Sequence, residues 1–185
     1  MTPSQRYAVD LQQSEFQDDP AQRQAVRELD RLHSDLTAAT GQPDRRSRGW
    51  LRRLFSTEQP QAAPEGLYLW GDVGRGKSYL MDLLFDTLPV AQKRREHFHA
   101  FMQMVHRRLR ELKDRTDPVA ELADALAADL RLLCFDELQV QDVADAMILG
   151  PLLSGMMQAG VTIVCTSNTA PRDLYRGGLQ RERFL

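Results

Sequence analysis

Short apolar runs alternate with stretches of helical spacing along most of the chain. The runs over 66–70, 130–135 and 161–165 are bounded by glycine or polar residues, and such runs predict buried strands. Helical patterns over 79–88 and 143–158 follow the first two runs. Because strands that alternate with helices usually form a parallel sheet, the pattern predicts an α/β fold in which helices flank a parallel sheet.

The N-terminal part contains the signature of one long helix. Asp19 is expected to cap this helix, Pro20 to occupy its first turn and Gln22 to take the capping-box position. The helix carries an apolar stripe made of Val26, Leu29, Leu32 and Leu36. Gly41 is expected to end it, whereas residues 3–19 show no clear periodicity.

A linker rich in Pro, Asp, Arg and Gly follows over 42–49. The segment Trp50–Phe55 then combines apolar residues with arginines in a short basic helix. Such a helix could contact an acidic partner or a membrane surface, and the alternative is packing on the core with solvated arginines. We therefore divide the chain into an N-terminal helical extension with a linker, over 1–65, and a core over 66–185.

Further elements are predicted between the first two apolar runs. They comprise a strand over 96–100, a helix over 101–114, and a helix over 118–129 that Asp117 caps. Asp142 is expected to start the last long helix, over 143–158. Pro151 interrupts this helix, where a proline is expected to kink or split it.

Composition and charge limit the class of protein. The chain has 185 residues, of which 42% are hydrophobic, and its formal net charge is −2. The N-terminus is acidic and lacks an apolar leader core, and no window reaches the roughly 18 apolar residues of a membrane span. Cys134 and Cys165 lie within apolar runs, where buried, reduced thiols are expected. We therefore expect a cytoplasmic protein.

Three histidines close together raise the question of a metal site. His97, His99 and His106 could place two imidazoles on one face of a strand. No carboxylate or cysteine completes a ligand set nearby, so structural or hydrogen-bonding roles are favoured.

The first strand run leads into a candidate phosphate-binding loop. Its sequence is Gly71-Asp72-Val73-Gly74-Arg75-Gly76-Lys77-Ser78, which matches the pattern G-x-x-x-x-G-K-[ST]. Glycines let the backbone N–H groups point inward, and the following helix adds its positive end to that anion site. Lys77 is expected to reach the β- and γ-phosphates of ATP, and Ser78 to bind Mg²⁺. The alternative is a glycine-rich turn with a surface lysine, but the flanking strand and helix favour the loop.

Candidate catalytic residues follow the second and third strand runs. Asp136 is expected to orient Mg²⁺ through its water shell, and Glu137 to polarise the water that attacks the γ-phosphate. Asn168 is expected to hold this water from the other side, with a simple turn residue as the alternative. Since these groups all follow strand C-termini, we expect the ligand in the crevice there.

The chain resembles a known family over nearly all of residues 3–185. The resemblance is carried by Asp19-Pro20-Ala21-Gln22, the strand and loop over 66–78, His97-Phe98-His99-Ala100-Phe101-Met102, and the segments 133–137, 142–147, 166–168 and 173–181. Together these motifs resemble the AFG-like ATPase family. The resemblance implies a P-loop NTPase of the AAA+ type, acting near the division ring in bacteria and in mitochondrial quality control in eukaryotes.

The resemblance also implies roles for individual residues. The Walker A loop matches Gly71, Gly74, Gly76, Lys77 and Ser78. The expected nucleotide-binding residues also include Asp72, Val73, Arg75 and Tyr79. Asp136 and Glu137 match the Walker B pair, and Asn168 matches the sensor-one position. Arg181, in preference to Arg183, matches the region that presents an arginine finger to a neighbouring subunit, which implies a homo-oligomer. Two solvated arginines are the alternative.

One departure concerns the C-terminus. Family members continue into a fifth strand and a helical lid, whereas this chain ends at Leu185, so we expect a partial protein without the lid. In the usual AAA+ sheet order this leaves the first strand as an unprotected edge.

Three functions remain open. The leading one is ATP hydrolysis that acts on a protein client, for which a division-ring component is one candidate. The second is a nucleotide-dependent scaffold without significant hydrolysis. The third is a helicase-loader-like AAA+ protein that acts on DNA, against which stand the net charge of −2 and the few aromatic residues among the basic ones.

Overall fold

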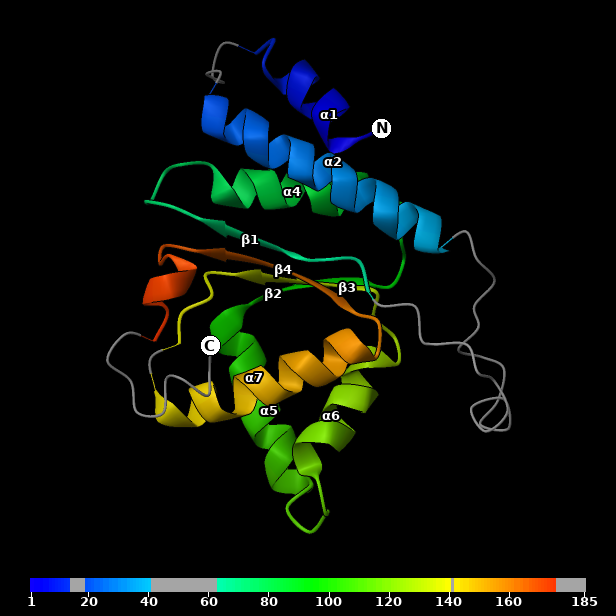
Figure 1. Ribbon diagram of the computed structural model, residues 1–185, viewed down its shortest axis with the longest axis vertical. Coiled ribbons are helices and arrows are strands. Elements are labelled where there is room, and N and C mark those ends of the chain that lie inside the picture. Colours follow the sequence, from blue (N-terminus) through cyan, green and yellow to red (C-terminus); the bar gives the residue numbers. More distant parts are fainter. Residues whose placement is uncertain (14–18, 41–62, 141, 176–185) are drawn as a thin grey trace.

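The computed structural model describes residues 1–13, 19–40, 63–140 and 142–175 (Figure 1). Its helices and strands are α1 (Pro3–Asp10), α2 (Pro20–Thr40), β1 (Leu67–Trp70), α4 (Lys77–Thr87), β2 (Lys93–His97), α5 (Phe98–Glu111), α6 (Pro118–Ala127), β3 (Leu132–Asp136), α7 (Val143–Gln158), β4 (Thr162–Ser167) and the 3₁₀ turn η2 (Pro171–Asp173). Strands and helices alternate from β1 onward, as the apolar pattern predicts.

The four described strands form one parallel sheet in the order β1-β4-β3-β2. Helices α1, α2 and α4 lie on one face of this sheet, and α5, α6 and α7 lie on the other (Figure 1). The predicted α/β class with a parallel sheet between helices is therefore confirmed. Because the strands are parallel, their C-terminal ends all lie at the same end of the sheet.

Successive residues of the central strands point to opposite faces and serve two cores. Cys134 and Val164 pack with α1, α2 and α4, whereas Phe135 and Cys165 pack with α5, α6 and α7. The Phe135 ring meets the Phe101 ring edge on, at 4.6 Å between centroids. Both cysteines are buried free thiols, as expected, and burial raises the pKa of Cys134 to about 12.

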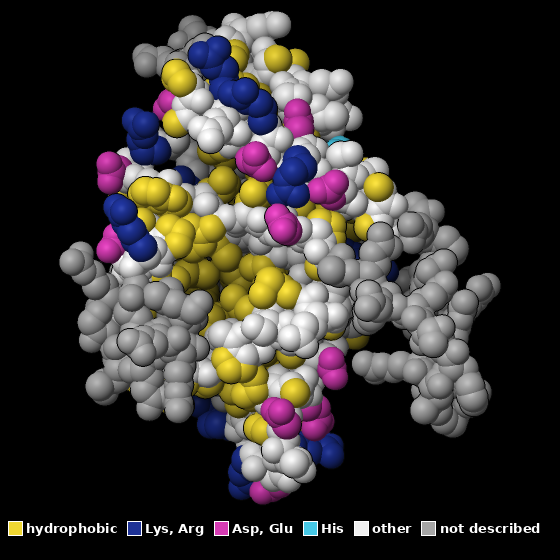
Figure 2. Space-filling model, in the orientation of Figure 1, with side chains coloured by type: hydrophobic (Ala, Val, Ile, Leu, Met, Phe, Trp, Pro, Cys, Tyr) yellow, Lys and Arg dark blue, Asp and Glu magenta, His cyan; other side chains and the backbone are white. Residues whose placement is uncertain are grey.

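Strand β1 lies at an edge of the described sheet, as the expected strand order predicts. Its first three residues are half-buried, and Trp70 at its end is 56% exposed. Figure 2 shows hydrophobic side chains gathered at the surface between the helices of the two faces.

The prediction for β2 was wrong at both ends. The strand spans Lys93–His97 instead of 96–100, and α5 begins at Phe98. Three successive basic residues hid this strand from the apolar pattern. They are tolerated there because their side chains have partners: the Lys93 ammonium group donates to the carbonyl oxygens of Phe85 and Leu88, the latter at 2.7 Å. His97 and His99 therefore lie on different elements and do not share a strand face.

Helix α1 was missed entirely. Thr2 and Gln5 form a capping box at its start: the Gln5 N–H donates to the Thr2 hydroxyl at 3.3 Å, and the Thr2 N–H donates to the Gln5 side chain at 2.9 Å. The signal was present in the sequence as Thr-x-x-Gln followed by a helical stretch.

Helix α7 begins after its cap Asp142, as predicted, and continues through Pro151 without being split. Leu149, Leu152 and Met156 are buried on either side of the proline. We attribute the continuity to this packing, which offsets the hydrogen bond that proline removes and the clash of its ring with the preceding turn.

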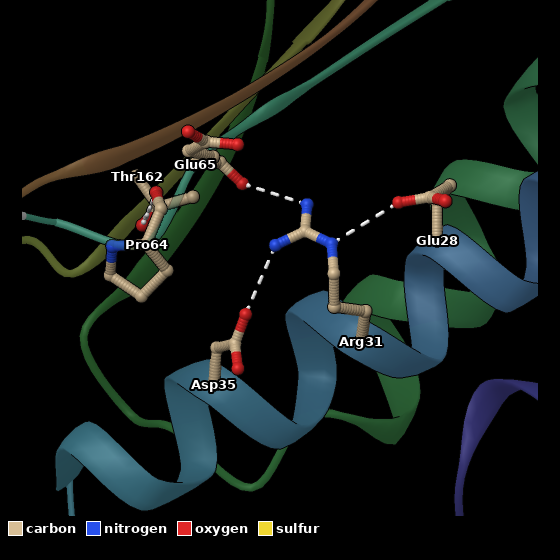
Figure 3. A network of polar contacts seen from close by, with 6 residues as sticks. All are labelled: Glu28, Arg31, Asp35, Pro64, Glu65 and Thr162. Atoms are coloured by element: carbon tan, nitrogen blue, oxygen red, sulfur yellow. Dashed lines mark hydrogen bonds and ion pairs between the residues drawn. The ribbon is translucent and has the colours of Figure 1, made fainter.

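Polar contacts hold the start of β1 in place (Figure 3). Arg31 of α2 pairs with carboxylates one turn before and after it on the same helix, and its guanidinium also donates to the Glu65 carbonyl oxygen at 3.3 Å. The Thr162 hydroxyl, at the start of β4, donates to the Pro64 carbonyl oxygen at 3.0 Å. Helix α2 and strand β4 therefore both fix the segment that enters β1.

Candidate active site

The loop between β1 and α4 has the backbone of an anion site. Gly74 and Gly76 have φ angles of 81° and 80°, in the left-handed region that favours glycine. An added Cβ at Gly74 would meet nothing within 4 Å, so the backbone angle, not space, requires glycine there. Gly76 is the N-cap of α4 and forms no side-chain capping bond, which leaves the first N–H groups of the helix to a bound anion.

Lys77 lies across this loop. Its Nζ donates to the carbonyl oxygens of Gly71 and Asp72, at 2.7 and 2.8 Å. Ser78 follows in the first turn of α4 and is exposed. A cation and a hydroxyl therefore stand at the loop, which is the placement that the sequence pattern predicts for a phosphate site.

Residues at the end of β4 bond both the start of the phosphate loop and the segment that follows β3. The Gly71 N–H donates to the Ser167 carbonyl oxygen at 3.3 Å, and the Glu137 N–H donates to the Thr166 hydroxyl at 3.0 Å. The Thr166 carbonyl and the Ser167 hydroxyl both bond the backbone of Leu138, each at 2.7 Å. The start of the loop is therefore anchored to Ser167, and the segment after β3 to both Thr166 and Ser167. Sequence reasoning selected neither, because only the pairing of strands reveals their contacts.

Glu137 adopts an uncommon backbone conformation. Its φ is 56°, in the left-handed region, and its side chain is exposed between the buried residues Asp136 and Leu138. Strain of this kind persists where the surroundings fix it, and it is frequent at functional sites. Here the bonds from Thr166 and Ser167 supply that constraint.

Asp136 is bound by an arginine that sequence reasoning missed. The Nε of Arg95, on β2, donates to Asp136 Oδ2 at 2.7 Å, and a terminal nitrogen of the same guanidinium donates to Oδ1 at 3.2 Å. The other terminal nitrogen pairs with Asp82 of α4. The hydrogen bonds to Asp136, followed by those to Asp82, raise the pKa of Arg95 above its ordinary value. A basic residue amid a strand was the only signal available.

The residues present suit Mg²⁺ together with a phosphate ligand. Mg²⁺ prefers oxygen ligands and keeps several waters, and the Ser78 hydroxyl and the Asp136 carboxylate are such groups. A carboxylate has about four lone-pair sites, and Arg95 uses one on each oxygen, so others remain for water. Within the described residues, no cluster of three or more His, Cys, Asp or Glu side chains could hold a metal ion by itself.

The histidines considered for a metal site have other contacts. His106 Nε2 lies 2.6 Å from Asp145 Oδ1, and His99 Nε2 lies 3.0 Å from the Gln103 side-chain amide. These contacts agree with the hydrogen-bonding roles that were favoured.

The N-terminal helices contact the phosphate loop directly. Gln22 takes the expected position in α2, but its amide donates to the Arg75 carbonyl oxygen at 3.2 Å instead of serving the helix start. Asp19 caps α2 through the Ala21 N–H at 2.8 Å and lies 3.6 Å from the Arg75 guanidinium. The Tyr79 hydroxyl, on α4, donates to a carboxylate oxygen of Asp10 at 2.8 Å.

Several predicted residues are not tested by this geometry. Asn168 is exposed directly after β4, and its role as a water-holding residue stays a prediction. Arg181, Arg183, the linker over 42–49 and the Trp50–Phe55 segment lie outside the described residues. In the part of the chain that the structure describes, no helix has the length and apolar character needed to cross a bilayer.

Comparison with known sequences identifies close relatives. A family model described as AFG1-like ATPase matches residues 1–185. The chain is 43% identical over 190 residues to the cell division protein ZapE of Escherichia coli (strain K12), an alignment that covers 100% of this chain and 50% of ZapE. The chain therefore spans about half the length of this curated relative.

Two solved structures share the fold. The crystal structure of DnaI matches with a TM-score of 0.54 and 20% identity, covering 92% of this chain and 79% of that one. The AMPPCP-bound DnaA from Aquifex aeolicus matches with a TM-score of 0.52 and 15% identity, covering 91% and 45%. At this level of identity the likeness shows the fold alone, which is that of P-loop proteins of the AAA+ type.

Proposed function

The chain belongs to the AFG1-like ATPase family, and from this premise we propose that it binds ATP with Mg²⁺ and hydrolyses the ATP to ADP and phosphate. The observation that carries the proposal is the anchoring of Gly71 and Glu137 to adjacent residues of β4. This anchoring brings a loop suited to phosphates and a carboxylate suited to water to the same end of the sheet. Hydrolysis needs both groups, one to position the phosphates and one to orient the attacking water.

Each residue then has a distinct task. The backbone N–H groups of the loop and of the first turn of α4 bind the phosphate oxygens. Lys77 exchanges its bonds to the Gly71 and Asp72 carbonyls for bonds to the β- and γ-phosphates. When bound, Mg²⁺ neutralises charge on the phosphates, and Ser78, with Asp136 through water, would hold it.

Glu137 accepts a proton from the attacking water. Its carboxylate is exposed, while its backbone N–H donates to the Thr166 hydroxyl. This bond fixes the backbone from which the side chain extends. Asn168, one residue beyond Ser167, is proposed to hold the same water from the other side. Arg181 is proposed to reach the γ-phosphate of a neighbouring subunit in a homo-oligomer.

The biological role is proposed by analogy. ZapE is described as a cell division protein, and the identity of 43% supports a role in cell division for this chain, through a protein client such as a division-ring component. We propose that it acts in the cytoplasm, where buried reduced thiols such as Cys134 and Cys165 are usual. The likeness to DnaI and DnaA supports the fold alone, so no observation favours the alternative that acts on DNA.

The test compares ATP binding and multiple-turnover hydrolysis for the chain and three variants. Glu137→Gln should bind ATP with a Kd within about twofold of the unaltered chain, while turnover falls by about 10²–10⁴-fold. Lys77→Ala should lose ATP affinity, and Glu111→Gln, at an exposed carboxylate on α5, should change neither quantity.

Two outcomes would change the conclusion. Equal turnover by Glu137→Gln and the unaltered chain would contradict the catalytic role of Glu137. ATP binding without turnover above the Lys77→Ala blank would favour the nucleotide-dependent scaffold. Specific activity that rises with protein concentration would support an arginine donated by a neighbouring subunit.

A further inference from the structure

Arg95 forms a bidentate, fork-like ion pair with the carboxylate of Asp136. Arg95 is paired in register with Cys134, and its side chain reaches two residues farther along β3. Its Nε and one terminal nitrogen each bond a different oxygen of Asp136, at 2.7 and 3.2 Å. Two parallel N–H to oxygen bonds fix the plane of a carboxylate, which a lysine at the same place could not do.

The same guanidinium also reaches the helix that follows the phosphate loop. Its remaining terminal nitrogen pairs with Asp82 of α4. Asp82 lies four residues after Ser78, and residues at this spacing share one face of a helix. Arg95 therefore connects the carboxylate of Asp136 with the helix face that carries Ser78.

We propose that Arg95 is a positioning residue of the magnesium site, which orients the Asp136 carboxylate and holds it against helix α4. The proposal rests on the function proposed above, since it concerns the same site. Asp136 is only 8% exposed, and a buried carboxylate needs a partner to remain charged and ordered. Arg95 provides this partner while it leaves other lone pairs of the carboxylate for water. Mutation of a residue that orients a metal ligand typically lowers metal affinity by about 10–100-fold.

A purely structural ion pair would behave differently. It would affect the stability of the fold without changing the Mg²⁺ dependence of nucleotide binding. The neighbouring residue offers a matched control: Arg94 is the adjacent residue of β2 and pairs with Glu96 on its own strand. Removal of the Arg94 guanidinium deletes a charge and an ion pair from the same strand without touching Asp136.

The experiment measures equilibrium binding of a fluorescent N-methylanthraniloyl ATP, first in EDTA and then across a Mg²⁺ series. The chain should bind more tightly as Mg²⁺ rises. Arg95→Met should bind within about twofold of the unaltered chain in EDTA, but its half-saturating Mg²⁺ concentration should rise by about tenfold or more. Asp82→Asn should give a smaller rise, because the fork on Asp136 remains, and Arg94→Met should give none.

The outcomes separate this proposal from the function on which it rests. If the unaltered chain binds no ATP, the proposed function fails, and the proposal fails with it. If the unaltered chain shows Mg²⁺-dependent binding but Arg95→Met has the same half-saturating Mg²⁺ concentration, the proposal alone is overturned. If Arg95→Met does not fold, Arg95→Lys takes its place: it keeps the charge but loses the fork, so at least a threefold rise is expected. An unchanged value for Arg95→Lys would then overturn the proposal.

Discussion

The side-chain amide of Gln22 donates a hydrogen bond of 3.2 Å to the backbone carbonyl oxygen of Arg75. This bond joins helix α2 to the phosphate loop across more than fifty residues of sequence. The same amide nitrogen lies 2.6 Å from the point that a Cβ on Gly76 would occupy. Helix α2 therefore contacts the phosphate loop directly.

Gly76→Ala should lower the free energy of unfolding by about 1–2 kcal/mol, because φ at this position is +80°. The amide of Gln22 ends a flexible side chain and can move, so the backbone angle should account for most of the loss. Urea unfolding of Gly76→Ala and of the double variant with Gln22→Ala checks this. Full recovery in the double variant would show instead that the contact with Gln22 causes the loss.

Thr166→Val should reduce ATP turnover by about three- to tenfold, as expected when a hydrogen bond of about 1 kcal/mol no longer fixes the Glu137 backbone. The Kd for ATP should stay within about twofold, since Thr166 is anchored to the Glu137 segment and not to the loop. Thr166→Ser, which keeps the hydroxyl, should restore turnover. If Thr166→Ser is as slow as Thr166→Val, the hydroxyl is not the cause.

The backbone of Glu137 predicts an order of stability for two variants that both lack the carboxylate. Glu137→Gly should be more stable than Glu137→Ala by about 1 kcal/mol. A left-handed residue with a Cβ is disfavoured by about 1–2 kcal/mol, and the greater entropy of glycine in the unfolded chain offsets part of this advantage. Thermal and urea unfolding measure the difference. Equal stabilities would indicate that φ at this position is not strained in solution.

Helix α2 should be held mainly by its apolar stripe. Leu32 is 0% exposed, so Leu32→Ala should lower the free energy of unfolding by about 2–5 kcal/mol. Arg31→Met, which removes the contacts drawn in Figure 3, should lower it by less than about 1 kcal/mol, because exposed ion pairs contribute little. A larger loss for Arg31→Met than for Leu32→Ala, by urea unfolding, would reverse this ranking.

The two thiols should make the protein less stable at alkaline pH. An unfolded thiol has a pKa of about 8.5, whereas burial raises the pKa of Cys134 to about 12 and also raises that of Cys165. At a pH between the pKa values of the unfolded and the folded thiol, the unfolded state binds fewer protons than the folded state. The free energy of unfolding therefore falls as pH rises. Urea unfolding between pH 8 and pH 10 should show the fall, and Cys134→Ala should reduce its slope.

Reactivity provides a control for this explanation. Ellman's reagent at pH 8 should label the thiols slowly in the folded protein and rapidly in denaturant, because both side chains are buried. Rapid labelling of the folded protein would contradict the burial on which the pH prediction depends.

Local signals in the sequence predicted much of the fold. Helix α7 was predicted from Val143 to Gln158 because Asp142 is a strong cap and a long apolar pattern follows it. The phosphate loop was predicted because the spacing of its glycines is itself the structural requirement. Strand β2 was misplaced since Lys93, Arg94 and Arg95 do not look like strand residues until their partners are known.

The supporting part of the site could not be predicted in the same way. The role of Arg95 depends on Asp136, which is 41 residues away, and that of Gln22 depends on Arg75, which is 53 residues away. Thr166 and Ser167 were recognised as a strand end, but their bonds to Glu137 and Leu138 arise only when β4 pairs beside β3. Long-range pairing, rather than residue type, determines these contacts.

The position of β1 beside β4 has a consequence for how the protein acquires its site during synthesis. The Tyr68 hydroxyl donates to the Thr169 carbonyl oxygen across 101 residues, and every described ladder contact of β1 is with β4. The ribosome therefore releases the phosphate loop long before the strand that anchors its first glycine exists. Closing so distant a contact is slow compared with forming local helices. The ability to retain a nucleotide should accordingly appear only after β4 has been made and has paired with β1.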